Sequence, residues 1–244
     1  MFRHQGKTRT LKHNLQIATV LSFVAGIVNV TGFLAIQQLT TNVTGHFALF
    51  IFGLENFNFW KASIYLLFII AFVLGSFASG FMIEMFKETK RLNVFVLPTL
   101  LEVAILLSVI LFYNITGVNY PGFIACALLF AMGLQNSFVT KISNAVVRTT
   151  HLTGLFTDLG IELSQLFFPK THPHIDKIKA TIKLRIFIIS FFFFGGITAG
   201  FFYSGLGWKS NTLILAAIIL LASLFYDDFR FRFIMARRKH FQGR

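Results

Sequence analysis

The feature that most constrains the fold of this chain is a six-residue polar motif that occurs twice, each time interrupting a long apolar run. The motif reads Thr-Thr-Asn-Val-Thr-Gly at positions 40–45 and Thr-Thr-His-Leu-Thr-Gly at positions 149–154. In so apolar a chain, hydroxyls, amides and free backbone groups are tolerated at membrane depth only where protein or a water-filled cavity satisfies them. The motif therefore predicts two broken helices with polar ends inside the protein.

The composition identifies the class of protein. Hydrophobic residues make up 55% of the 244 residues, charged residues only 13%, and 33 residues are Phe. The mean hydropathy is +0.72. These values exclude an ordinary soluble domain and indicate an integral membrane protein. The single cysteine, Cys126, excludes an internal disulfide.

Two more landmarks recur in the same order. Gly26 and Asn29 precede Gly133 and Asn136 by 107 positions, and the small-residue segment 75–81 is echoed at 195–201, 120 positions later. The offset grows because the second half carries an additional hydrophilic loop, expected near 169–181. We therefore divide the chain into a basic N-terminus (1–14), a first repeat (15–116), a second repeat (117–226) and a basic tail (227–244).

Six apolar segments are long enough to cross about 30 Å of hydrocarbon at roughly 20 residues each. They are expected near 15–39, 59–86, 93–113, 120–139, 182–203 and 211–226. The shorter apolar segments at 46–54 and 155–168 are expected to form half-helices that directly follow the polar motifs. Because three spans per repeat is an odd number, the repeats are inverted. The sequence thus predicts an all-α membrane protein of two inverted three-helix repeats, with the motifs approaching the midplane from opposite sides.

The basic residues predict the orientation. In a six-span chain, 20 of the 22 Lys and Arg residues fall on one side, and only Lys61 and Lys209 fall on the other. The positive-inside rule then places both termini in the cytoplasm. A charge distributed over alternate loops argues against nucleic-acid binding, despite the net charge of +13. We expect the tail to lie against anionic lipid, with its aromatic residues at the interface.

The two motifs carry the candidate ligand-binding residues. Their hydroxyls and amides both donate and accept hydrogen bonds, which suits a small polar solute or ion. The alternative is a purely structural role, in which these groups cap the short helices and join the spans. The candidate substrate-binding residues are Asn29, Thr41, Asn42, Thr44, Gly45, Asn136, Thr150, His151, Thr153 and Gly154.

Several ionisable residues have two readings. Glu102, in the third span, is either a proton-coupling carboxyl or a structural acid held neutral or paired. Asp158 and Glu162 share a helix face near Arg148, and an ion-pair network is favoured over a catalytic carboxylate pair. No metal site is expected, because His46 and His151 lack further ligands at suitable spacing. Known enzyme motifs and cofactor motifs are not found, so we expect neither catalysis nor a cofactor.

Small residues four positions apart give the segments 75–81 and 195–201 a face for close helix packing. The face of each segment meets either its repeat-related counterpart or another subunit. We expect the contact within the chain.

The repeated segments resemble a known family. Gly-Ile-Val-Asn-Val-Thr-Gly-Phe at 26–33, Thr-Gly at 44–45, Gly-Leu-Gln-Asn-Ser at 133–137 and the stretch 148–154 are similar to the YoaK-type family of bacterial inner-membrane proteins, a domain of unknown function. The resemblance spans the chain and implies a six-span bacterial protein with a presumed transport role. Family members often carry an acid where this chain has Asn29, and Asn where it has His46 and Leu155. Glu102 is then the only acid deep in the first repeat.

Together these patterns predict a small secondary transporter or permease that works by alternating access around the paired motifs. The alternatives are a homo-oligomeric channel and a non-transporting membrane module that binds a partner or lipid. A homodimer is expected because a six-span chain resembles half of a larger carrier.

Overall fold

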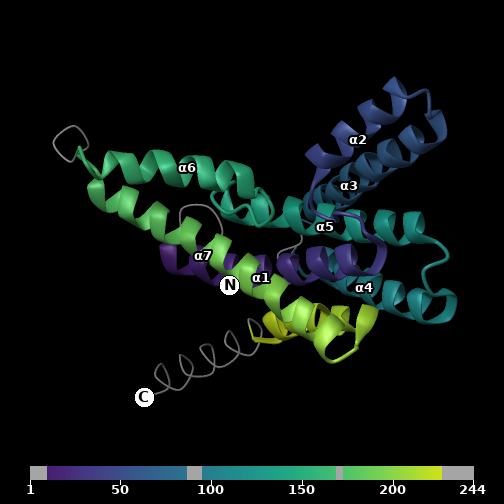
Figure 1. Cartoon of the computed structure of the whole chain (residues 1–244). Helices are drawn as coiled ribbons and strands as arrows, with labels where there is room; N and C mark the ends of the chain where they lie inside the picture. The colour runs from purple at the N-terminus through teal and green to yellow at the C-terminus, as the bar shows by residue number, and fades with distance from the viewer. Residues whose placement is uncertain (1–9, 87–94, 169–172, 227–244) are drawn as a thin grey trace, which may run out of the picture.

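A computed structural model describes residues 10–86, 95–168 and 173–226, and all regular structure within these ranges is helical (Figure 1). Six helices are long and apolar enough to cross a membrane, which confirms the prediction of an all-α membrane protein with six spans. They are α1 (Leu11–Ile36), α3 (Phe59–Phe86), α4 (Val96–Thr116), α5 (Pro121–Ser143), α7 (Ile175–Gly200) continued by the π-helical turn η3 (Phe201–Gly205), and a final span, Lys209–Tyr226, that begins with the 3-10 turn η4 (Lys209–Thr212).

Two short helices follow the polar motifs directly. These are α2 (Val43–Glu55) and α6 (Leu152–Gln165), and each begins three residues earlier than the sequence predicts. Asn42 precedes α2 and accepts a hydrogen bond from the Gly45 amide at 2.9 Å, so the motif itself starts the helix. Figure 1 shows that α2 and α6 begin near the middle of the molecule and diverge from there.

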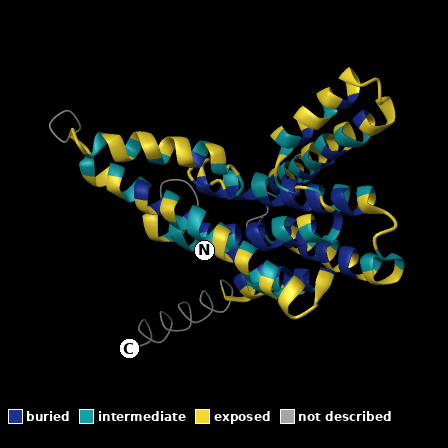
Figure 2. Ribbon diagram, viewed as in Figure 1, coloured by how far each residue is buried: buried dark blue, intermediate teal, exposed yellow. Residues whose placement is uncertain are grey.

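The long helices pair across the two halves of the sequence. α1 packs along α7, and α3 packs along α5, while α2 lies on α3 and α6 lies on α7. α1 and α5 are the most buried spans and form the centre of the molecule (Figure 2). The first helix of each half is therefore packed mainly against helices of the other half.

Glycines allow these helices to approach closely. At four positions an added Cβ would overlap a carbonyl oxygen of the neighbouring helix, so larger side chains are excluded there. The pairs share the offsets of 107 and 120 positions seen in the sequence. They are Gly26 against Phe192, Gly133 against Phe72, Gly195 against Phe23 and Gly75 against Phe130.

The small-residue faces at 75–81 and 195–201 contact other helices than their repeat-related counterparts. The expected contact within the chain is present, but the two faces do not meet each other: Gly75 lies against α5 and Gly195 lies against α1. The reason is the cross-pairing of the helices, which places the second span of each half, α3 or α7, beside the first span of the other half, α5 or α1.

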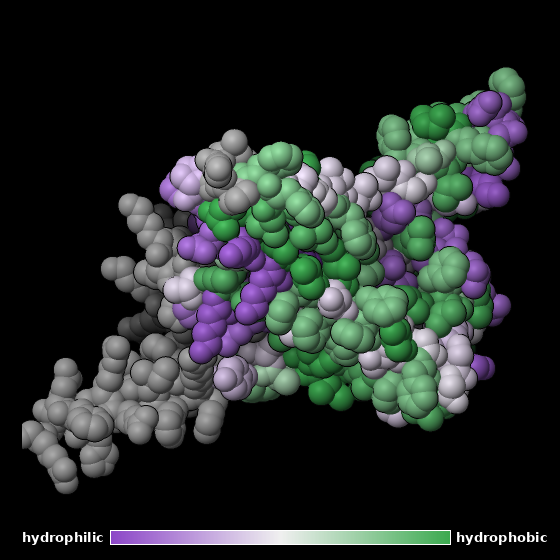
Figure 3. All heavy atoms as spheres, turned by 60° about the vertical axis from the view of Figure 1, so that its left-hand side comes forward, coloured by the Kyte–Doolittle hydropathy of each residue, from purple (hydrophilic) through white to green (hydrophobic). Residues whose placement is uncertain are grey.

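Large apolar side chains remain exposed around the outside of the bundle. Phe77, Phe81, Leu111 and Phe193 each expose more than half of their surface. Figure 3 shows apolar residues over much of one side of the molecule, with hydrophilic residues gathered in patches. Such a surface suits a lipid bilayer, where apolar side chains face hydrocarbon.

The predicted loop at 169–181 is described from residue 173 onward, and this part is largely helical because α7 begins at Ile175. This first part of α7 packs against α6, and Arg185 on it pairs with Glu162 of α6. The basic segments at 1–9 and 87–94, and the tail at 227–244 with its predicted lipid contact, lie outside the described residues.

Candidate functional site

Matching hydrogen bonds join each polar motif to the helix that precedes it. The Thr41 hydroxyl donates to Oδ1 of Asn29 at 2.8 Å, and the Thr150 hydroxyl donates to Oδ1 of Asn136 at 2.8 Å. All four side chains are partly buried. The two bonds occupy equivalent places in the repeated segments, so the motifs have the same local architecture.

The chain reverses its direction just before each motif. α1 ends at Ile36 and α5 ends at Ser143, and the next residues, Gln37 and Asn144, have φ angles of 56° and 51°. A left-handed residue after the last helical turn redirects the backbone. The reversal returns the motif alongside the last turns of its own helix, within reach of the asparagine.

The first threonine of each motif is fully buried. The Thr40 hydroxyl donates to the carbonyl oxygen of Val28 at 3.3 Å. Thr149 accepts from the Gln135 side chain at 3.2 Å, and the same Gln135 nitrogen donates to the carbonyl oxygen of Leu21 at 2.8 Å. These bonds hold both motifs against the central helices, and Gln135 links α5 to α1.

Both motifs line one cavity of about 750 Å³. The remaining wall comes from the middle of α3 and the last turns of α5. The lining residues are Thr41, Asn42, Val43, Thr44, Phe72, Val73, Ser76, Asn136, Ser137, Thr140, Lys141, Arg148, Thr150, His151, Leu152 and Thr153. Segments more than 100 positions apart in the sequence therefore share one cavity.

A smaller cavity of about 330 Å³ adjoins this space. Arg148 and His151 line both cavities, whereas Asp158, Thr181 and Arg185 line only the smaller one. The two cavities are thus separated by the residues around the start of the second motif.

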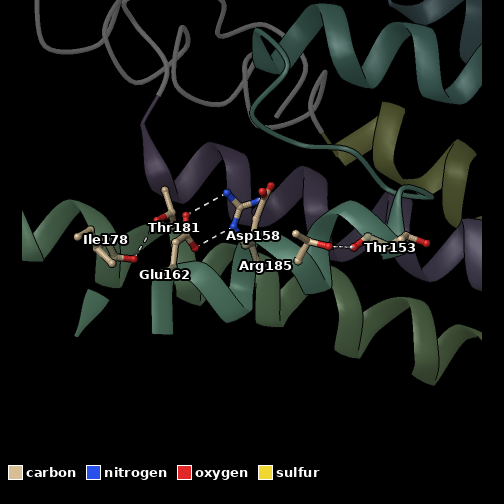
Figure 4. Close-up of polar contacts among 7 residues, drawn as sticks. Thr153, Asp158, Glu162, Ile178, Thr181 and Arg185 are labelled. Atoms are coloured by element: carbon tan, nitrogen blue, oxygen red, sulfur yellow. Dashed lines mark hydrogen bonds and ion pairs between the residues drawn. The ribbon is translucent and has the colours of Figure 1, made fainter. Parts of the chain in front are cut away.

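An ion-pair network joins α6 to α7 beside the smaller cavity (Figure 4). Arg185 donates to Glu162 through Nε at 2.8 Å and Nη2 at 3.0 Å, and its Nη1 lies 2.9 Å from Asp158. The sequence predicts a network at these acids but places it near Arg148. The cation is Arg185, because the α6–α7 hairpin brings it alongside both carboxylates.

The larger cavity has a positive lining. Among the described residues, Lys141 and Arg148 are the charged ones that line it, and none of its described lining residues is a carboxylate. Lys141 pairs with Glu84 at 2.5 Å. Within the described ranges Arg148 forms no ion pair, and its side chain is exposed.

Most of the predicted ligand-binding residues meet at the larger cavity. Those lining it are Thr41, Asn42, Thr44, Asn136, Thr150, His151 and Thr153. Asn29 is held behind Thr41, the Gly45 amide is occupied by Asn42, and Gly154 lines the smaller cavity. The sequence analysis did not identify Ser76, Lys141 or Arg148 as lining residues. Arg148 directly precedes the second motif, and this position in the sequence could have identified it as a lining residue.

Glu102 lies apart from both cavities. It sits seven residues into α4, is fully buried, and neither carboxyl oxygen has a hydrogen-bond partner within the described residues. Burial of an unpaired carboxylate costs far more than burial of its neutral form. The side chain is thus a candidate for a proton-binding role away from the polar motifs.

Comparison with known families gives one match. A family described as "Protein of unknown function (DUF1275)" matches residues 17–226, a range that covers most of the first span, the other five spans, both polar motifs and Glu102. No curated protein and no solved structure matches the chain.

Proposed function

This chain belongs to the DUF1275 family of proteins of unknown function, and we propose that it is a small secondary transporter or permease for a small polar solute or ion. The observation that carries the proposal is the convergence of both polar motifs on one cavity of about 750 Å³. A volume of this order accommodates a small molecule. Broken helices that meet at a polar space are a recurrent design of transporter sites.

Inverted repeats give this site a route to alternating access. The paired Thr–Asn hydrogen bonds and the matched glycine contacts support an internal repeat. Three spans per half imply opposite orientations in the membrane. In such a protein, the α3–α5 pair and the α7–α1 pair exchange roles as the site opens to one side and then to the other.

We assign the observed cavity to an inward-open state of a protein in the bacterial cytoplasmic membrane. The resemblance to the YoaK-type family supports this location. With both termini in the cytoplasm, as the positive-inside rule indicates, the end of α5 faces inward. Thr140 and Lys141, in the last turn of α5, line the cavity. Glu102 is the proton-coupling candidate in this scheme, and a homodimer is the proposed assembly.

The test is solute exchange by the full chain in liposomes. A panel of radiolabelled amino acids, sugars and inorganic ions is screened for saturable counterflow. We expect Thr41→Val and Thr150→Val to reduce the exchange, because each removes a hydroxyl at the cavity. Thr198→Val is the matched control, since Thr198 lies partly exposed on α7, lines neither cavity, and donates its hydroxyl to the carbonyl oxygen of Phe194.

The other functions give different results in the same liposomes. A channel produces unitary conductance and no counterflow. A module that binds a partner or lipid gives no flux with any solute. Unchanged exchange in both threonine variants would show that the transport site lies elsewhere.

A further inference from the structure

The charges around the larger cavity do not balance. Of the nearby acids, Glu84 is paired with Lys141, while Asp158 and Glu162 are both held by Arg185. Arg148 lines both cavities and has no acidic partner in the part of the chain that the structure describes. Cations that line a cavity raise the local concentration of anions, and no described side chain supplies a negative charge to Arg148.

We propose that the transported solute is a small anion with a carboxylate or oxyanion group, bound at Arg148. This inference rests on the transport function proposed above and names the chemical class of its substrate. A guanidinium presents a planar fork of donors, which matches two oxygens of a carboxylate, sulfate or phosphate group.

The surroundings of Arg148 supply further donors. Thr44, Ser137 and Thr153 place hydroxyls at the cavity. Leu152 and Thr153 also form the first turn of α6, and the side chain of His151 does not cap that helix. The amides of this turn point away from the helix toward its N-terminal end, where the helix dipole favours negative charge. These groups add to the attraction that Arg148 provides.

The repeat fold itself does not require these cations. At the equivalent positions of the first half, Lys141 is replaced by Leu34 and Arg148 by Leu39. The first half nevertheless forms the same Thr–Asn hydrogen bond and the same chain reversal. The positive charge is therefore an addition to the shared architecture, and it lies at the cavity.

The experiment measures thermal unfolding of the full chain in detergent. The sodium salts of sulfate, phosphate, nitrate and acetate are titrated at constant ionic strength, with chloride as the background salt. Choline chloride and glucose serve as the cationic and neutral probes. We expect saturable stabilisation by at least one oxyanion or carboxylate, and tracer exchange of the same anion in liposomes.

Three variants test the role of Arg148. Arg148→Gln is expected to weaken anion affinity by roughly 10- to 100-fold, the effect of losing a charged hydrogen-bonding group. Arg148→Lys is expected to bind with intermediate affinity, which keeps the test valid if the Gln variant fails to fold. Lys183→Gln removes one positive charge from an exposed position of α7 that lines neither cavity, and is expected to bind normally.

The outcomes separate this inference from the transport proposal. Equal anion affinity in the wild type and in Arg148→Gln would overturn the assignment to Arg148. Binding and exchange of only a neutral or cationic solute, lost in Thr150→Val, would overturn the anion class while keeping the transporter. No stabilisation and no exchange by any of the four anions would also overturn the anion class.

Discussion

The Thr150 hydroxyl donates to Oδ1 of Asn136 at 2.8 Å and thereby ties the second polar motif to α5. The Thr41–Asn29 bond does the same for the first motif and α1, at the same distance. Each bond sits where the chain has turned back on a spanning helix. The motifs are thus positioned by a specific side-chain pair in addition to the backbone reversal.

A double-mutant cycle measures this connection. We expect Thr150→Val to destabilise the protein, because it leaves the Asn136 oxygen without its donor. Combining it with Asn136→Leu should cost less than the sum of the single changes, with a coupling energy of about 0.6 kcal/mol, as for other membrane-protein hydrogen bonds. The free energy of unfolding in mixed detergent gives the values. Strictly additive effects would mean that the bond contributes nothing to stability.

The Arg185 network predicts unequal roles for its two acids. Glu162 forms two hydrogen bonds and its side chain is 14% exposed, whereas Asp158 is 52% exposed. We expect Glu162→Gln to lower the free energy of unfolding by about 1.5–3 kcal/mol and Asp158→Asn by less than about 1 kcal/mol.

Thermal unfolding at low and high salt checks this ranking. Only the smaller Asp158 contribution should fade strongly with salt, because exposed ion pairs are screened. Glu84→Gln is the control, since its pair with Lys141 is exposed on both sides. A larger loss from Asp158→Asn than from Glu162→Gln would contradict the ranking.

The sequence predicted those parts of the fold that depend on the length of apolar segments or on residues repeated at a constant offset. Apolar length identified the six spans, and the recurrence of Gly26 and Asn29 as Gly133 and Asn136 located the repeated reversals. The cross-pairing of the helices has no such signature, since a small-residue face does not specify its partner.

The ion-pair partners at the site could likewise not be predicted from the sequence. Arg148 lies ten positions before Asp158, and Arg185 lies 23 positions after Glu162. Sequence distance favoured Arg148 as the ion-pair partner. The hairpin between α6 and α7 brought Arg185 to the acids instead, and it left Arg148 at the cavity.

Close packing at the glycines predicts a large steric effect. A Cβ at Gly26 or Gly133 would overlap a backbone carbonyl oxygen, which cannot move without shifting a helix. We expect Gly26→Ala and Gly133→Ala each to cost about 1–3 kcal/mol of stability, the range for overpacked cores.

Gly160→Ala is the matched control for these two variants. Gly160 lies inside α6 with open space around it, so alanine should leave stability equal or higher, by up to about 1 kcal/mol from helix propensity. Chemical unfolding of all three variants in one detergent provides the comparison. If the three variants unfold alike, the close approach of the helices is not a source of stability.

Glu102 predicts opposite effects on stability and on transport. Its carboxyl is buried with no partner among the described residues, so it carries a desolvation cost that nothing in the bundle offsets. We expect Glu102→Met, which fills a similar volume without polar atoms, to raise the free energy of unfolding by about 1–3 kcal/mol.

Glu102→Gln keeps the shape and a polar group but cannot exchange a proton. If Glu102 couples transport to protons, both variants should still exchange solute between equal compartments, while uptake driven by a pH gradient is lost. Normal gradient-driven uptake in Glu102→Gln would remove the coupling role. A drop in stability for Glu102→Met would instead show that the carboxyl is a stabilising part of the bundle.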